Sequence, residues 1–85
     1  MRLVIASPAN GAILKDALKA HLQNDPRVSS LVDLSSPEGT YPQLSFAAAE
    51  EVAAGRADRA LLICGTGVGT AIAANKVRGI RAATA

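Results

Sequence analysis

The stretch of residues 60–76 constrains the fold most, because an apolar run passes through a glycine-rich turn into a helical pattern. The run Ala60–Ile63 is short and uncharged, which is typical of a strand buried on both faces of a parallel sheet. Glycine permits positive φ angles and the close approach of a ligand to the backbone. Three alternate glycines follow the run, namely Gly65, Gly67 and Gly69. From about Val68 the apolar residues have helical spacing, so the sequence predicts a buried strand whose turn opens a helix.

The only cysteine of the chain, Cys64, stands at the start of this turn. A single cysteine excludes an internal disulfide and a cysteine-based zinc site. Thiols at helix N-termini have lowered pKa values, and the unpaired N–H groups there favour negative charge. Cys64 is therefore a candidate base or nucleophile beside an anion-binding turn. The alternative is a small core residue in a tight connection, because free cysteine is often buried and a lone Gly-x-Gly-x-Gly pattern is a weak signal.

Strand and helix patterns alternate along the whole chain, which predicts one α/β domain over residues 1–85. The expected strands are residues 3–6, 28–34, 60–63 and 79–84, and the expected helices are 13–22, 43–54 and one beginning near residue 68. Connections of this length allow right-handed crossovers, so we expect a parallel sheet of about four strands with flanking helices, a Rossmann-like three-layer sandwich. A strand order of 2-1-3-4 places Ser7–Gly11 beside the Cys64–Gly69 turn, at the carboxyl edge where such sheets bind ligands.

The first helix is expected to be amphipathic. Its apolar face is assigned to Ile13 or Leu14, Ala17 or Leu18, and Leu22; its solvent face is assigned to Lys15, Asp16 and Lys19. The second helix is expected to end at Gly55, since glycine commonly follows a helix C-terminus.

Composition limits the classes of function. The net charge is only +2 and the basic residues are scattered along the sequence. The clustered basic residues typical of nucleic-acid-binding proteins are therefore missing. No apolar run is long enough to span a membrane, and no signal-peptide pattern is visible, so a cytoplasmic protein is expected. His21 lies in a helical pattern without neighbouring metal-ligand types, so it is expected to be an ordinary surface or helix-end residue. A chain of 85 residues builds only a small aliphatic core, and the stability of such a domain is marginal. This predicts association with further copies.

Several motifs together resemble the type B ribose-5-phosphate isomerases and their relatives, the galactose-6-phosphate and tetrulose-phosphate isomerases. The resemblance covers nearly the whole chain, and its glycine motif is specific. It is carried by residues 62–69, 71–76 and 79–82, by Gly11 with Leu14 and Lys15, and by Tyr41 with Pro42.

This resemblance implies aldose–ketose isomerisation of a phosphorylated sugar through an enediolate, without a cofactor or metal. Cys64 would move the proton between C1 and C2, the backbone amides of Gly65–Gly69 would hold the oxyanion, and Thr66 would contact sugar oxygens. The positions implied to contact substrate are Gly65, Thr66, Gly67, Val68, Gly69, Pro8, Ala9 and Tyr41. The family is dimeric with a shared site, which implies a homodimer or homotetramer.

The chain departs from the family pattern in two places. Pro8 and Ala9 stand where family members carry an Asp-His pair, or Asp followed by another residue, and neither replacement can ionise. The chain also resembles only the amino-terminal half of the family, whose other half would supply a ring-opening histidine, an asparagine and phosphate-binding arginines. One alternative is therefore a non-catalytic anion-binding or assembly module. Another is a phosphotransferase-system IIB subunit, although there the cysteine ends the first strand.

Overall fold

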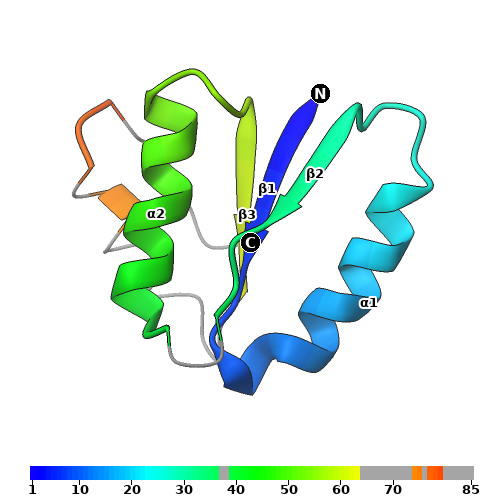
Figure 1. The fold of residues 1–85 in the computed structure, drawn as a ribbon, viewed down its shortest axis with the longest axis horizontal. Coiled ribbons are helices and arrows are strands. Elements are labelled where there is room, and N and C mark those ends of the chain that lie inside the picture. The colour runs from blue at the N-terminus through cyan, green and yellow to red at the C-terminus, as the bar shows by residue number, and fades with distance from the viewer. Residues whose placement is uncertain (37–38, 64–73, 76, 80–85) are drawn as a thin grey trace.

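The computed structural model describes residues 1–36, 39–63, 74–75 and 77–79. In chain order its elements are β1 (Arg2–Ala6), the 3-10 helix η1 (Ala9–Gly11), α1 (Ala12–Gln23), β2 (Ser30–Asp33), α2 (Tyr41–Ala53) and β3 (Arg59–Leu62). The described strands form one parallel sheet in the order β2-β1-β3 (Figure 1). The predicted order of the first three strands is therefore confirmed. The Cys64–Gly69 turn, most of the third predicted helix and all but Gly79 of the fourth predicted strand lie outside the described residues.

The sheet lies between α1 and α2, so the predicted three-layer α/β arrangement is confirmed (Figure 1). Helix α1 contacts β2 and β1, whereas α2 contacts β1 and β3. The central strand β1 is the most buried of the three, with Ile5 fully inaccessible to solvent. On the α2 side, Val4 packs with Ala48 and Ala57, and the small alanine side chains allow the helix to approach the sheet closely. The continuous apolar run of β1 is thus explained by burial on both faces.

Strand β3 corrects one expectation, because it is not buried on both faces. Ala60 and Leu61 are exposed, Leu61 at 36%, and only Ile63 just beyond the strand is buried. The reason is position: β3 is an edge strand of the described sheet, and α1 packs on β1 and β2 instead. Strand β2, predicted to lie near an edge, does so.

Helix α1 also differs from the predicted amphipathic pattern. Its inward side carries Lys15, Leu18 and Leu22, whereas Ile13 is 91% exposed and Leu14 is 56% exposed. The assignment of Lys15 to the solvent face is therefore wrong. The physical reason is that Asp33 of β2 offers a carboxylate 2.8 Å from the Lys15 ammonium, and an ion pair makes the burial of a lysine tolerable.

Helix α2 begins and ends with local signals that the sequence supplies. At its N-terminus, Thr40 Oγ1 accepts a hydrogen bond from the Gln43 N–H, and Gln43 Oε1 accepts one from the Thr40 N–H, which forms a capping box. Pro42 stands in the first turn, where its missing N–H costs nothing. At the other end Gly55 has a φ of +79°, which confirms the predicted glycine terminus.

One polar group on α2 is buried without a partner in the described structure. Ser45 is fully inaccessible, and its hydroxyl oxygen makes no hydrogen bond there. Replacing Ser45 by alanine should therefore raise the free energy of unfolding by about 1 kcal/mol, because the desolvation cost of the hydroxyl disappears. Urea unfolding measures the shift, and Ser36→Ala, at an exposed position, serves as the control with little change. A lower stability of Ser45→Ala would contradict the expectation.

Candidate functional site

The carboxyl ends of β1 and β3 lie side by side and form the candidate site. Ala6 is in register with Leu62, and the Ile63 N–H donates to the Ala6 carbonyl at 3.1 Å. After Ala6 the chain enters the Ser7–Gly11 turn, and after Ile63 it enters Cys64. Helices α1 and α2 leave this edge on opposite faces of the sheet, which is the arrangement in which doubly wound sheets bind ligands (Figure 1).

Gly11 brings the two chain segments together. A Cβ on Gly11 would lie 2.4 Å from Ser7 Oγ and 3.1 Å from both Cγ2 and the carbonyl oxygen of Ile63. The Ser7–Gly11 turn is therefore in direct contact with the residue that precedes Cys64. The predicted adjacency of the two turns stays a prediction, because Cys64, Gly65, Thr66, Gly67, Val68 and Gly69 lie outside the described residues.

The structure places Pro8 and Ala9 at this edge. The Pro8 carbonyl accepts hydrogen bonds from the Gly11 N–H at 3.0 Å and from Ser7 Oγ at 2.7 Å, so it is fully engaged within the turn. Pro8 is half-buried and Ala9 is exposed. Neither side chain can ionise or donate, so both offer a ligand only apolar contact. Tyr41 stands in the first turn of α2 and is 46% exposed, on a segment that also begins at this edge (Figure 1).

A polar network behind the turn was missed by sequence reasoning. Asp33 Oδ2 lies 2.8 Å from Lys15 Nζ and 3.3 Å from Lys19 Nζ, while Asp33 Oδ1 accepts a hydrogen bond from the Ser35 N–H at 2.8 Å. Ser35 Oγ in turn accepts a hydrogen bond from the Ser7 N–H at 2.9 Å. The network thus joins α1, the end of β2 and the first residue of the turn.

The network is charged at neutral pH. Burial favours a raised pKa for Asp33, but hydrogen bonds from Lys15 and Ser35 outweigh it and hold the pKa well below the usual range. Hydrogen bonds to Asp16 and Asp33 raise the pKa of Lys15. A sequence signal for the buried lysine did exist, because Lys15 has the helical spacing i, i+3, i+7 with Leu18 and Leu22.

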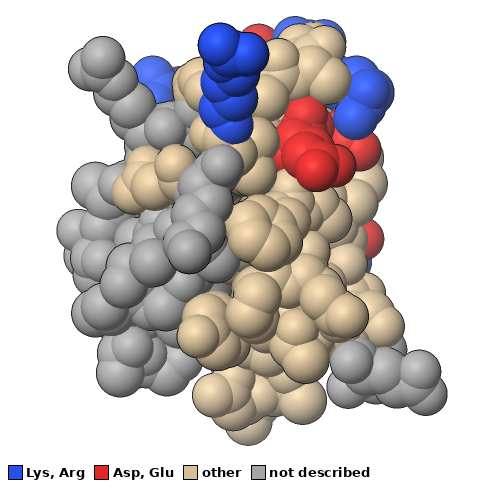
Figure 2. Space-filling model, turned by 90° about the vertical axis from the view of Figure 1, so that its left-hand side faces the viewer, with Lys and Arg blue, Asp and Glu red and all other residues tan. Residues whose placement is uncertain are grey.

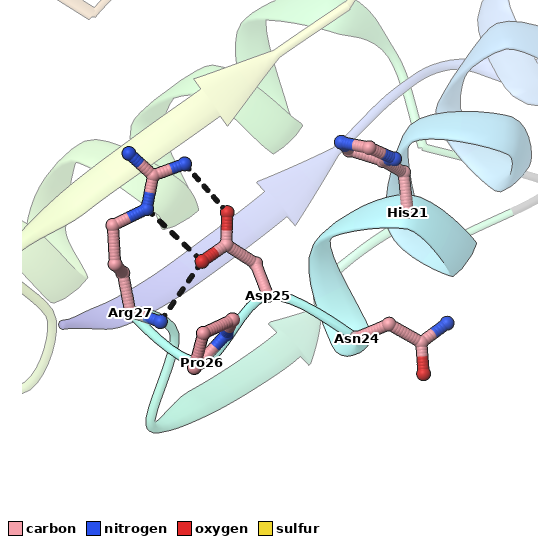
Figure 3. Close-up of a pocket in the computed structure, with 5 residues that line it drawn as sticks. All are labelled: His21, Asn24, Asp25, Pro26 and Arg27. Carbon is pink, nitrogen blue, oxygen red and sulfur yellow. Dashed lines mark hydrogen bonds and ion pairs between the residues drawn. The ribbon is translucent and has the colours of Figure 1, made fainter.

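A shallow hollow at the other end of the sheet is a weaker candidate. It is lined by His21, Asn24, Asp25, Pro26 and Arg27, at the C-terminal end of α1 (Figure 3). There the Asp25 carboxylate accepts hydrogen bonds from the backbone N–H, Nε and Nη2 of Arg27, at 2.9, 3.0 and 2.7 Å. The opposite charges of Asp25 and Arg27 therefore neutralise each other. The hollow also lies at the amino ends of the strands, away from the edge where such sheets bind ligands.

Two further kinds of site find no support in the described parts of the chain. No group of three or more His, Cys, Asp or Glu side chains that could hold a metal occurs among residues 1–36, 39–63, 74–75 and 77–79. Within the same ranges, no helix has the length and apolar character needed to cross a bilayer.

Comparison with known proteins identifies the family. The model of the Ribose/Galactose Isomerase family matches residues 3–85. The chain belongs to this family. It is 52% identical over 89 residues to D-erythrulose-4-phosphate isomerase 2 of Mycolicibacterium smegmatis, covering 100% of this chain and 59% of that protein. It is 47% identical over 73 residues to ribose-5-phosphate isomerase B of Escherichia coli, covering 85% of this chain and 49% of that protein.

Solved structures of type B ribose-5-phosphate isomerases superpose closely on this chain. Ribose-5-phosphate isomerase B of Clostridium thermocellum superposes with a TM-score of 0.86 at 38% identity, covering 95% of this chain and 55% of that one. The type B ribose 5-phosphate isomerase of Leishmania infantum gives a TM-score of 0.85 at 29% identity, covering 94% of this chain and 54% of that one. The chain therefore spans little more than half the length of these family members.

Proposed function

We propose that this chain is the amino-terminal part of a sugar-phosphate isomerase that interconverts an aldose and a ketose through an enediolate. The observation that carries the proposal is the contact between the Ser7–Gly11 turn and Ile63, at the carboxyl edge of a sheet of this family. That contact sets the Ser7–Gly11 turn beside the residue that leads into the Cys-Gly-Thr-Gly-Val-Gly motif. Relatives that carry the names of sugar-phosphate isomerases support the reaction class.

In the proposed reaction Cys64 is the base. Its thiolate takes the proton from C2 of the aldose, the C2–H electron pair forms the C1–C2 double bond, and negative charge moves onto O1. Backbone amides of Gly65–Gly69 stabilise that oxyanion, and Thr66 contacts the sugar oxygens. The proton then returns to C1 while the O2 proton passes to O1, which leaves the ketose. Atoms and electrons balance without an oxidant or a cofactor.

The apolar Pro8–Ala9 pair favours one second candidate, a non-catalytic anion-binding or assembly module of the same family. Neither Pro8 nor Ala9 has a side chain that could grip a phosphate or open a sugar ring. In the isomerase proposal, the phosphate is held by arginines outside residues 1–85, as the family resemblance implies. Substrates with four carbons need no ring opening, and one named relative acts on erythrulose 4-phosphate.

Proton exchange at the reacting carbon separates the two candidates. The full natural protein is incubated in D₂O with aldose and ketose phosphates of four, five and six carbons, and deuterium at C1 or C2 is followed by NMR. Deuterium incorporation together with product formation supports the isomerase. Binding of a sugar phosphate without deuterium incorporation supports the module and contradicts the isomerase.

The sugar-phosphate site is proposed to work in a homodimer or homotetramer. Ile13 and Leu14 of α1 are exposed, and so are Tyr41 and Phe46 of α2. On the α2 side, charged side chains gather around the end where α2 finishes, and most of the described surface below is uncharged (Figure 2). Exposed apolar surface of this kind favours association. Light scattering at micromolar concentration should give a multiple of the chain mass, and a monomeric mass would contradict this expectation.

A further inference from the structure

The β1–β2 pairing continues past the end of the strands through a side chain. The last backbone hydrogen bond between the two segments runs from the Leu34 N–H to the Ile5 carbonyl at 2.9 Å. The next β1-side donor, the Ser7 N–H, is bound by Ser35 Oγ at 2.9 Å instead of by a backbone carbonyl. The hydroxyl of Ser35 therefore anchors the first residue of the Ser7–Gly11 turn.

Ser35 is itself held in place by Asp33, which is in turn held by Lys15. Its backbone N–H donates to Asp33 Oδ1 at 2.8 Å, and the other oxygen of that carboxylate is paired with Lys15 at 2.8 Å. The side chains of Lys15 and Asp33 are only 11% and 16% exposed. A charge pair in this partly buried place is screened by solvent less than a surface pair, so it restricts the position of Ser35.

The anchored turn has little room to move on its other side. Ser7 Oγ donates to the Pro8 carbonyl at 2.7 Å, and Gly11 packs between Ser7 and Ile63 so tightly that a Cβ would not fit. The turn is thus clamped between Ser35 on the β2 side and Ile63 on the β3 side. A displacement at Ser35 would reach the residue before Cys64 through these contacts.

We propose that Ser35, held by Asp33 and Lys15, is a positioning residue for the isomerase reaction. It fixes the Ser7–Gly11 turn against Ile63 and so fixes the edge of the sheet where the sugar phosphate reacts. Misplacement of a reacting group by an ångström costs up to about 100-fold in rate, so a supporting hydroxyl of this kind affects turnover without touching substrate. This inference rests on the proposed function.

The test compares Ser35→Ala with Ser35→Thr in the full natural protein. Ser35→Ala removes the acceptor, so hydrogen exchange of the Ser7 amide, read by NMR, should accelerate about tenfold, and kcat should fall about tenfold with a smaller change in KM. Ser35→Thr keeps a hydroxyl and should restore both values toward those of the parent. Ser36→Ala, at the exposed neighbouring position, should change neither.

A second control separates positioning from stability. Asp58 accepts a hydrogen bond from the Arg2 N–H at 2.7 Å and pairs with its guanidinium at 3.1 Å, at the amino end of the sheet. Asp58→Asn should therefore lower stability while kcat stays at the parental value. An unchanged Ser7 exchange rate in Ser35→Ala, or an unchanged kcat, would overturn the inference. A parent protein inactive on every sugar phosphate would instead refute the proposed function, and Ser7 exchange would still show whether Ser35 holds the turn.

Discussion

Replacing Cys64 by alanine is expected to lower kcat of the proposed isomerase by about 10²- to 10⁴-fold, the usual contribution of a positioned general base. The methyl group cannot take the proton from the substrate carbon, so deuterium exchange at that carbon should fall in parallel with turnover. KM should change little, because the positions proposed to contact the bound substrate, Thr66 among them, are other residues. Steady-state kinetics and exchange in D₂O measure both effects.

Two further measurements distinguish this role from a structural one. If Cys64 is only a small core residue, Cys64→Ala lowers stability by an amount that urea unfolding detects, and the isomerase retains most of its rate. Cys64→Ser serves as the matched control, because a hydroxyl fills almost the same space but its proton is held far more tightly than that of a thiol. Parental turnover in either variant would show that another group is the base.

The fold was predictable where local pattern and burial agree. β1 is an uninterrupted apolar run and lies in the centre of the described sheet, where Ile5 is fully buried. Gly55 follows α2 with positive φ, as a glycine after a helix C-terminus is expected to do. The alternation of strand and helix patterns predicted a parallel sheet with right-handed crossovers, and the first three strands have the order expected for a doubly wound sheet.

Prediction failed where a distant residue decides the outcome. The face of α1 was assigned wrongly because Lys15 counts as polar in any helical pattern, whereas the carboxylate of Asp33, 18 residues away, pairs with it and makes its burial tolerable. The exposure of Leu61 has a similar origin, since hydrophobicity alone does not show which helix covers which strand. In both cases a tertiary contact decides the outcome, although the helical spacing of Lys15 with Leu18 and Leu22 was a signal for its burial.

For the candidate site, too, one part was predictable from the sequence and another was not. Topology predicted that the Ser7–Gly11 turn lies beside the Cys64–Gly69 turn; the structure shows the first turn against Ile63, and its adjacency to Cys64–Gly69 stays a prediction. The hydrogen bond between Ser35 and the Ser7 N–H was not predictable, because it joins a loop side chain to a backbone group 28 residues away. The roles of Cys64 and the glycine turn remain predictions from the motif and the family.

Gly11→Ala should have the second large effect, because the new methyl group has no space. Gly11 has φ −109° and ψ 5°, which alanine can adopt, so the effect is steric and not a matter of backbone strain. The Cβ would lie 2.4 Å from Ser7 Oγ and 3.1 Å from the Ile63 carbonyl oxygen, and one side must move. Overpacking of this kind costs about 1–3 kcal/mol, which urea unfolding measures.

Activity should fall further than stability alone explains, by up to about 100-fold in kcat, because the turn is pushed away from the end of β3. Adding Ser7→Ala removes the closest contact but leaves those to Ile63, so the double variant should recover part of the stability and little of the turnover. Gly55→Ala is the control: its Cβ meets open space but its φ of +79° is unfavourable, so it should lose about 1 kcal/mol and keep its kcat. If Gly11→Ala lost stability but kept full turnover, the Ser7–Gly11 turn would not form part of the reacting edge.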